Sequence, residues 1–312
     1  MPENWAINTR EIMTKTLGII LAAGRSSRLY PATTAVSKQL LPIYDKPLIY
    51  YPLSTLMLAG IRDYVVIVNP EEKSLFEKLF STAVLHMGIN VKVAVQLVPR
   101  GLPEGFTIAN AVEPFESYDN IALILGDNLF HGATLTESLQ RGSSNTKVAK
   151  IYGQKVTDLH RFGVVGIDKL TREIQYIVEK PETLTGKFID LAITGLYFFP
   201  KDIADRAKIL KPSARGELEI TDLINAYQKE GLLDVEQFKR GISWFDTGTA
   251  DSLLDASHYV KTIQSNQGFL VGSPHEVAMR NKWVENIDIL TYLKTVEKST
   301  YGKLLIEVFT NG

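Results

Sequence analysis

Short apolar runs alternate with segments of helical periodicity along the first half of the chain. The runs typical of buried strands cover residues 17–22, 64–68, 91–95 and 120–125. The helical patterns between them cover residues 47–58, 71–80 and 106–112. Parallel strands are usually connected by a helix, so this alternation predicts an α/β fold with a mostly parallel central sheet and helices on both faces.

Beyond about residue 148 the pattern changes to shorter strands separated by turns. These predicted strands cover 147–156, 163–167, 174–179 and 192–199, and they indicate hairpins in a smaller mixed sheet. Apolar residues near helical spacing predict an amphipathic helix over 250–264, and helical patterns also cover 277–284 and 287–293. Neither a repeat nor a low-complexity linker interrupts the sequence, so one α/β core with a C-terminal helical addition is expected.

Composition and charge narrow the class of protein. The 312 residues include 34 Lys and Arg against 35 Asp and Glu, and 45% of them are hydrophobic. This composition supports a large core and does not fit a disordered chain. The near-neutral balance lacks the positive field that nucleic-acid binding needs, so we expect small anionic ligands held by a few placed cations.

The chain has no cysteine, which excludes disulfides, thiolate zinc sites and thiol nucleophiles and fits a reducing, cytoplasmic compartment. Its apolar runs are well below the ~18 residues that span a bilayer, so no membrane association is expected. Residues 1–16 include Glu3 and Glu11 and have no apolar centre, so we interpret them as a flexible N-terminal extension and not a secretory signal. A shorter start at Met13 stays open.

A loop of small and cationic residues, 22–31, follows the first predicted strand. Small side chains let backbone N–H groups approach a phosphate, and Arg25 and Arg28 supply forked cations. The loop matches neither the G-x-G-x-x-G fingerprint nor a P-loop, so an ordinary polar turn is an equal alternative.

Lys38 either snorkels from a partly buried segment or reaches a bound anion. Two cations beside one turn repel each other, which favours an anion between them.

Two carboxylates are expected beyond the carboxyl ends of the strands, where parallel sheets bind their ligands. Asp127 follows the run 120–125 and Gly126, and Asp246 lies between an apolar pair and a small-residue turn. Carboxylates, phosphate oxygens and water form the usual environment of Mg²⁺. The alternatives are a turn residue for Asp127 and a helix N-terminal residue for Asp246.

Two further charged segments stand out. Glu179 and Lys180 are adjacent at a predicted strand end, so their side chains point to opposite faces and need different partners, unless both are simply solvated. The segment 211–222 is unusually charged, and its last two residues could cap a helix. The five histidines have no ligand spacing and G-x-S-x-G is absent, which argues against zinc and serine-hydrolase chemistry.

These motifs belong to a longer series that covers residues 17 to about 268. The series comprises 17–24, 28–31, 36–47, 50–62, 125–128, 161–165, 179–181, 194–197, 211–222 and 244–249. In this order it resembles the sugar-1-phosphate nucleotidylyltransferase family, and its thymidylyl members in particular. The resemblance implies a Rossmann-like nucleotidyltransferase fold and Mg²⁺-assisted transfer of a nucleotidyl group from a nucleoside triphosphate to a sugar 1-phosphate, with release of pyrophosphate. It further implies dTTP, glucose 1-phosphate and dTDP-glucose, in the dTDP-rhamnose pathway.

The same resemblance assigns expected roles to individual residues. The expected catalytic residues are Arg28 and Lys38 at the leaving end of the triphosphate, Asp127 and Asp246 on Mg²⁺, and Lys180 at the sugar phosphate. The expected nucleotide-binding residues are Leu21, Ala23, Gly24, Arg25, Ser26, Ser27, Gly101, Glu104, Ala109 and Gly126. The expected sugar-phosphate-binding residues are Phe162, Gly163, Glu179, Lys180, Thr194, Gly195 and Arg215.

The resemblance also implies a domain organisation. Residues 17–268 form the nucleotidyltransferase domain, with a nucleotide half over about 17–147 and a sugar-phosphate half over about 148–268. Residues 269–312 form the C-terminal helical addition. Family members are commonly homotetramers with a regulatory nucleotide site near these helices, so a homo-oligomer is expected. The residues 278–283 do not decide whether that site is retained.

Several positions depart from the family pattern. Ser26 and Ser27 replace Gly and Thr, and Phe162 replaces Tyr. Glu104 replaces the Gln that reads thymine, and Ala109 replaces a glycine of the same pocket. An ionised Glu only accepts hydrogen bonds, so guanine, with two adjacent donors, suits it better than thymine or uracil. Three hypotheses follow: transfer from dTTP or UTP with the carboxyl protonated or turned away, the same reaction with GTP, or a non-catalytic nucleotide-sugar-binding homologue.

Overall fold

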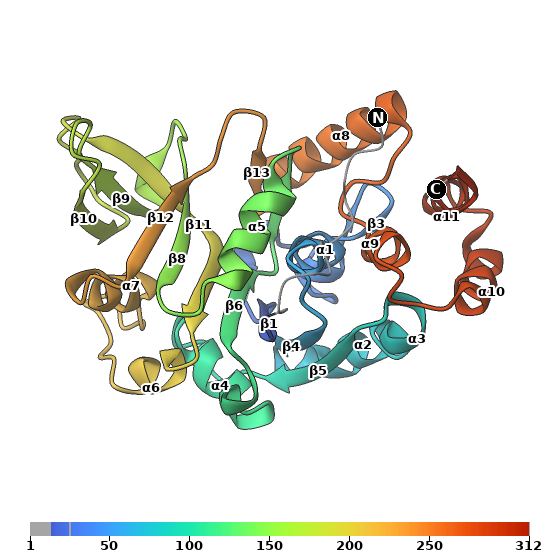
Figure 1. Ribbon diagram of the computed structural model, residues 1–312, viewed down its shortest axis with the longest axis horizontal. Helices are drawn as coiled ribbons and strands as arrows, with labels where there is room; N and C mark the ends of the chain where they lie inside the picture. The colour runs from blue at the N-terminus through green and yellow to red at the C-terminus, as the bar shows by residue number, and fades with distance from the viewer. Residues whose placement is uncertain (1–13, 25, 312) are drawn as a thin grey trace.

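The computed structural model describes residues 14–24 and 26–311, and Figure 1 shows how their elements are arranged. Arg25 and residues 1–13 of the predicted extension lie outside the described residues. Thr16, assigned to that extension, is already the first residue of strand β1 (Thr16–Leu21). The sheet that β1 belongs to organises the rest of the molecule.

A nine-stranded sheet runs in the order β10-β9-β11-β6-β1-β4-β5, with β8 beside β11 and β12 beside β8. Its other strands are β4 (Asp63–Val68), β5 (Asn90–Val95), β6 (Asn120–Leu125), β8 (Ala149–Gln154), β9 (Gly163–Ile167), β10 (Ile174–Glu179), β11 (Ile189–Pro200) and β12 (Leu233–Gln237). The pairs β6-β1, β1-β4 and β4-β5 are parallel. The long strand β11 is antiparallel to β6, β8 and β9. The predicted combination of a parallel centre and a mixed second part is therefore confirmed.

Helices cover both faces of the sheet because its central strands are apolar on both sides. In β1, Ile20 packs into one buried cluster, and Leu17 and Ile19 pack into another. The first cluster includes residues of α1 (Tyr50–Leu58), α2 (Lys73–Leu79), α3 (Ala83–Met87), α5 (Leu135–Ser144) and α9 (Pro274–Arg280). The second includes residues of α4 (Glu104–Val112), α6 (Ile203–Lys208) and α7 (Ile220–Lys229).

A two-stranded antiparallel ribbon outside the large sheet was not predicted from the sequence. It consists of β7 (Asn128–His131) and β13 (Ser243–Asp246), with Asn128 opposite Asp246. A second small ribbon pairs β2 (Pro42–Ile43) with β3 (Lys46–Pro47). The β7-β13 ribbon joins the end of β6 to the segment before α8 (Ala250–Gln267), so residues from both halves of the sequence meet there.

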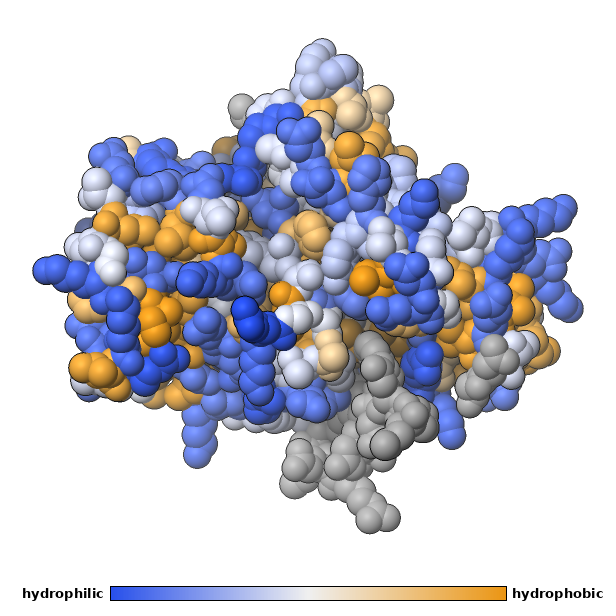
Figure 2. Space-filling view, turned by 90° about the horizontal axis from the view of Figure 1, so that it is seen from above, coloured by the Kyte–Doolittle hydropathy of each residue, from blue (hydrophilic) through white to orange (hydrophobic). Residues whose placement is uncertain are grey.

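The C-terminal part is helical, as predicted. Helices α10 (Asn286–Val296) and α11 (Thr300–Asn311) follow α9, and Figure 1 shows them at the end of the molecule opposite β9 and β10. In the part of the chain that the structure describes, no helix is long and apolar enough to cross a bilayer. The face seen in Figure 2 is mostly hydrophilic, with separate apolar patches instead of one continuous apolar surface.

Candidate active site

A cleft of about 420 Å³ opens where β6, β9, β10 and β11 meet the β7-β13 ribbon. Its charged lining residues are Arg28, Asp127, Arg161, Glu179, Lys180 and Asp246. Its apolar wall includes Leu102, Leu125, Ile193, Tyr197 and Ile220. The cleft therefore combines opposite charges from distant segments with an apolar wall, as pockets for small molecules commonly do.

The two carboxylates expected to bind metal lie in this one cleft. Asp127 follows β6 after Gly126, where a Cβ would lie 2.7 Å from the carbonyl oxygen of Leu21, so glycine allows the β1 loop to pass closely. The carbonyl oxygen of Asp127 accepts hydrogen bonds from the backbone N–H of Thr247 (3.1 Å) and from its hydroxyl (2.8 Å). Because Thr247 directly follows Asp246, these bonds fix the two acidic positions relative to each other.

Cationic side chains neutralise both carboxylates. Lys38 Nζ forms an ion pair with Asp127 Oδ2, and Arg161 Nη2 lies 3.0 Å from Asp246 Oδ2. A Cβ at Gly248 would lie 2.8 Å from Arg28 Nη2 and 3.1 Å from Asp246 Oδ1, so both side chains border that glycine. Burial, and then the negative charge of Asp127, raise the pKa of Asp246, while the three cations oppose the rise.

Five of the seven expected sugar-phosphate residues line the same cleft. Phe162, Gly163, Glu179, Lys180 and Gly195 line it. Gly163 is opposite Glu179 in the β9-β10 pair, and a Cβ there would lie 3.2 Å from Glu179 Oε2. Burial, and then the charge of Glu219, raise the pKa of Glu179.

Two of the expected sugar-phosphate residues do not line the cleft. The side chain of Thr194 is fully buried, and its hydroxyl has no hydrogen-bond partner among the residues that the structure describes. Arg215 lies beyond Glu179, at 3.7 Å from Glu179 Oε1, and is paired more closely with Glu217 at 2.9 Å. Its contact with the cleft is therefore made through Glu179.

The small-residue loop borders a neighbouring cleft of about 350 Å³, which Gly24, Ser26, Lys38, Leu97 and Pro99 help to line. Ser27 begins a short 3₁₀ helix that contains Arg28, so this loop connects the two clefts. Leu21 and Ala23 are partly buried against the core that contains Phe106 of α4.

The other expected nucleotide-binding residues differ in their surroundings. Gly101 has a φ of 115° and forms a β-bridge with Leu218. Ala109 is fully buried in the core, away from the lining of both clefts. Glu104 is the first residue of α4 and is not among the described residues that line either cleft.

Comparison with known proteins identifies the family of this chain. The profile of the family described as Nucleotidyl transferase matches residues 17–263. This chain belongs to that family. It is 46% identical over 291 residues to a glucose-1-phosphate thymidylyltransferase of Neisseria gonorrhoeae, covering 93% of this chain and 98% of the relative. It is 43% identical over 294 residues to the enzyme of the same name from Mycobacterium tuberculosis, with the same two coverages.

A solved structure supports the fold of this nucleotidyl transferase. A Bacillus anthracis protein assigned as a glucose-1-phosphate thymidylyltransferase, in complex with sucrose, superposes with a TM-score of 0.69 at 33% identity. The superposition covers 78% of this chain and 94% of that one. A UDP-glucose pyrophosphorylase complexed with UDP-glucose, at 24% identity and a TM-score of 0.67, shares the fold.

The carboxylates in the cleft of this nucleotidyl transferase can supply some, but not all, of the ligands of a Mg²⁺ ion. Asp127 and Asp246 offer hard carboxylate oxygens, which magnesium prefers. Among the described residues, no group of three or more His, Asp or Glu side chains could hold a metal. Magnesium usually keeps water and substrate phosphate among its ligands, so two carboxylates are a sufficient protein contribution.

Sequence reasoning missed two residues that contact the predicted carboxylates, and a third that holds one of those two. Arg161 pairs with Asp246 across 85 positions of sequence, Asn128 donates to Asp127, and Trp244 donates to Asn128. Arg161 and Trp244 are within motifs of the resemblance, but no local pattern reveals their partners. The one signal in the sequence that they belong to the site was their position next to other motif residues.

The loop residue Ser26 adopts a left-handed conformation, with φ 44° and ψ 32°. This region costs a residue with a β-carbon roughly 1–2 kcal/mol, and glycine much less. We expect Ser26→Gly to raise the unfolding free energy by about 1 kcal/mol and the melting temperature by about 2 °C. The matched control Ser27→Gly should give no gain, because Ser27 is in the adjoining 3₁₀ helix. An equal rise in both variants in a thermal melt would contradict strain at Ser26.

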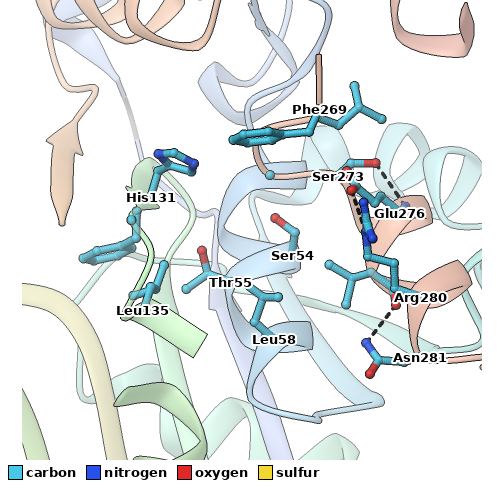
Figure 3. Close-up of a pocket in the computed structure, with 15 residues that line it drawn as sticks. Ser54, Thr55, Leu58, His131, Leu135, Phe269, Ser273, Glu276, Arg280 and Asn281 are labelled. Carbon is cyan, nitrogen blue, oxygen red and sulfur yellow. Dashed lines mark hydrogen bonds and ion pairs between the residues drawn. The ribbon is translucent and has the colours of Figure 1, made fainter. Parts of the chain in front are cut away.

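A third cavity, of about 100 Å³, lies between α1, β7 and α9. Figure 3 shows His131 and Phe269 on its upper side and Ser54, Thr55 and Leu58 of α1 below them. Arg280 Nε lies 2.8 Å from Glu276 Oε1 on the α9 side.

Proposed function

We propose that the protein transfers the thymidylyl group of dTTP to glucose 1-phosphate, forming dTDP-glucose and pyrophosphate. The observation that carries the proposal is the meeting of Asp127, Asp246 and Arg28 with Glu179 and Lys180 in one cleft. The names of the relatives point to the same substrates. By the resemblance, the proposed enzyme is a cytoplasmic homotetramer that supplies dTDP-rhamnose formation.

The reaction needs no covalent intermediate on the protein. A phosphate oxygen of glucose 1-phosphate attacks the α-phosphorus, and the bond from that phosphorus to the bridging oxygen of the β-phosphate breaks, so pyrophosphate leaves with the electron pair. Lys180 and Glu179 orient the sugar phosphate, while Arg28 and Lys38 neutralise the leaving pyrophosphate. Asp127 and Asp246 would hold Mg²⁺, which when bound spreads the charge of the phosphates.

The proposal is tested by measuring pyrophosphate release from glucose 1-phosphate and Mg²⁺ with each of the five common nucleoside triphosphates. We expect dTTP to give the highest kcat/KM. Release from none of the five, combined with tight binding of dTDP-glucose, would favour the non-catalytic homologue. The presence of the full expected set, Arg28, Lys38, Asp127, Glu179, Lys180 and Asp246, argues against that alternative.

The contacts of Glu104 bear on the choice of base. Its Oε2 accepts a hydrogen bond from Gln96 Nε2 (2.7 Å) and another from the backbone N–H of Arg100 (3.3 Å). Those two bonds use the acceptor capacity of Oε2, so Oε1 is the oxygen left for a base. Oε1 lies 3.9 Å from Arg100 Nε. Guanine would need both carboxylate oxygens, whereas thymine or uracil needs one acceptor for N3–H and one donor for a carbonyl oxygen, which Arg100 supplies.

We therefore expect Glu104→Ala to lower kcat/KM for dTTP by about 10–100-fold, the loss of hydrogen bonding to a charged group. Glu104→Gln should stay within a few-fold of the wild type, because its amide both accepts and donates. The exposed Glu116→Ala serves as the control. Faster reaction of the wild type with GTP than with dTTP would reverse the assignment of the base.

A further inference from the structure

The side chain of Asn128 connects Asp127 to strand β13 and to β11. Its Oδ1 accepts hydrogen bonds from Trp244 Nε1 at 2.6 Å and from the backbone N–H of Gly195 at 3.3 Å. Its Nδ2 donates to Asp127 Oδ1 at 2.8 Å. The indole and backbone N–H groups can only donate, so the amide oxygen must face them and the amide nitrogen must face the carboxylate. The surroundings thus permit one orientation of this amide.

The position of the indole N–H is itself fixed by packing. The ring of Trp244 is stacked with Phe130 at 10° and 6.4 Å between centroids, and it contacts Phe162 at 5.0 Å. Asn128 is only 2% exposed, so water does not easily replace its partners. A Cβ at Gly195 would lie 2.8 Å from Asn128 Oδ1, which shows how closely β11 approaches the amide.

Asp127 is therefore restrained at both carboxylate oxygens. Lys38 pairs with Oδ2 and Asn128 donates to Oδ1. Asn128 is also the residue opposite Asp246 in the β7-β13 register, so one side chain borders both acidic residues. Groups that hydrogen-bond to metal ligands orient them, and their loss typically lowers metal affinity or activity by about 10–100-fold.

We propose that Asn128 and Trp244 are positioning residues, which hold the carboxylate of Asp127 in the orientation that binds the divalent cation. The proposal rests on the proposed function, because it assigns a task to two residues of that same cleft. Asn128 and Trp244 also line the cleft, so a direct contact with the sugar is the competing explanation.

Three substitutions separate these explanations. Trp244→Phe keeps an aromatic ring between Phe130 and Phe162 and removes the N–H. Asn128→Asp keeps an acceptor for Trp244 but replaces the donor facing Asp127 with an oxygen. Asn128→Ala removes both functions. Two matched controls lie outside the cleft: Trp283→Phe, and Asn286→Asp at an exposed position at the start of α10.

The first measurement is calorimetric titration of each variant with Mn²⁺, with and without an α,β-methylene analogue of dTTP that cannot react. The second is steady-state kinetics for both substrates, and the third is the melting temperature. For Trp244→Phe we expect Mn²⁺ affinity and kcat to fall by about 10-fold, and for both Asn128 variants by up to about 100-fold. KM for glucose 1-phosphate should stay within about 3-fold of the wild-type value, and both controls should match the wild type.

A rise in that KM with unchanged Mn²⁺ affinity would assign the two residues to the sugar and overturn the proposal. A lower melting temperature with unchanged Mn²⁺ affinity and kcat would mean that Asn128 and Trp244 have a structural role only, and this result would also overturn the proposal. A wild type that binds Mn²⁺ but transfers no nucleotide would instead refute the proposed function, since the titration is read without turnover.

Discussion

Asp127→Asn is expected to lower kcat by about 10²–10³-fold, the usual loss when a group that stabilises transition-state charge is removed. The amide keeps the size of the side chain and can still accept a hydrogen bond from Lys38, so the fold should persist. The melting temperature should shift by only a few degrees. Near-normal pyrophosphate release at an unchanged melting temperature would refute the role of this carboxylate.

The same substitution should change the pH dependence of the activity that remains. The charge of Asp127 helps to raise the pKa of Asp246, second to burial, and a carboxyl must lose its proton before it binds a cation. Without that charge the pKa of Asp246 falls toward its ordinary value. The acidic limb of the pH–rate profile should therefore move to lower pH in Asp127→Asn. Asp255→Asn, at an exposed position of α8, should leave both the rate and the profile unchanged.

Lys38→Met is the second substitution with a large expected effect. The side chain of Lys38 is 8% exposed and is paired with Asp127, and it is the expected partner of the leaving pyrophosphate. We expect kcat/KM for dTTP to fall by about 10²–10³-fold, because the leaving charge loses a placed cation in a partly enclosed site. KM for dTTP should rise more than KM for glucose 1-phosphate.

Removing Lys38 also leaves a partly buried carboxylate without its ion-pair partner, which can destabilise a protein by several kcal/mol. Lys38→Arg keeps the charge and separates the two effects: it should restore the melting temperature while recovering only part of the activity, since a planar fork differs from an ammonium group. Lys261→Met, at an exposed position of α8, is the control. Equal KM values for dTTP in Lys38→Met and the wild type would exclude contact with the triphosphate.

The sequence predicted the bounds of those strands whose apolar pattern is continuous or strictly alternating. The run 120–125 and the strands 163–167 and 174–179 have the predicted bounds, because continuous apolar runs and clear alternation are typical of strands in such sheets. Helix α5 was missed because its sequence is mostly polar with glycine and serine, and only a narrow face that includes Leu135 and Leu139 is buried. Tertiary packing, not propensity, stabilises such a helix.

In the site, the sequence predicted the charged residues but not their partners. Asp127 follows an apolar strand pattern and could be placed at the sheet edge, and Asp246 was singled out between an apolar pair and a small-residue turn. The ribbon that joins them depends on the pairing of four-residue strands more than a hundred positions apart, which no local pattern records. The same holds for the contact between Arg161 and Asp246.

The ion pairs of Asp127 with Lys38 and of Asp246 with Arg161 have a consequence for ligand entry. Each acidic group already has a counter-ion, so under the proposed function Mg²⁺ would compete with these two ion pairs for the carboxylates. Admission of the charged substrate would then be an exchange of salt-bridge partners, in which the cation takes the carboxylates and Lys38 is freed for a phosphate oxygen.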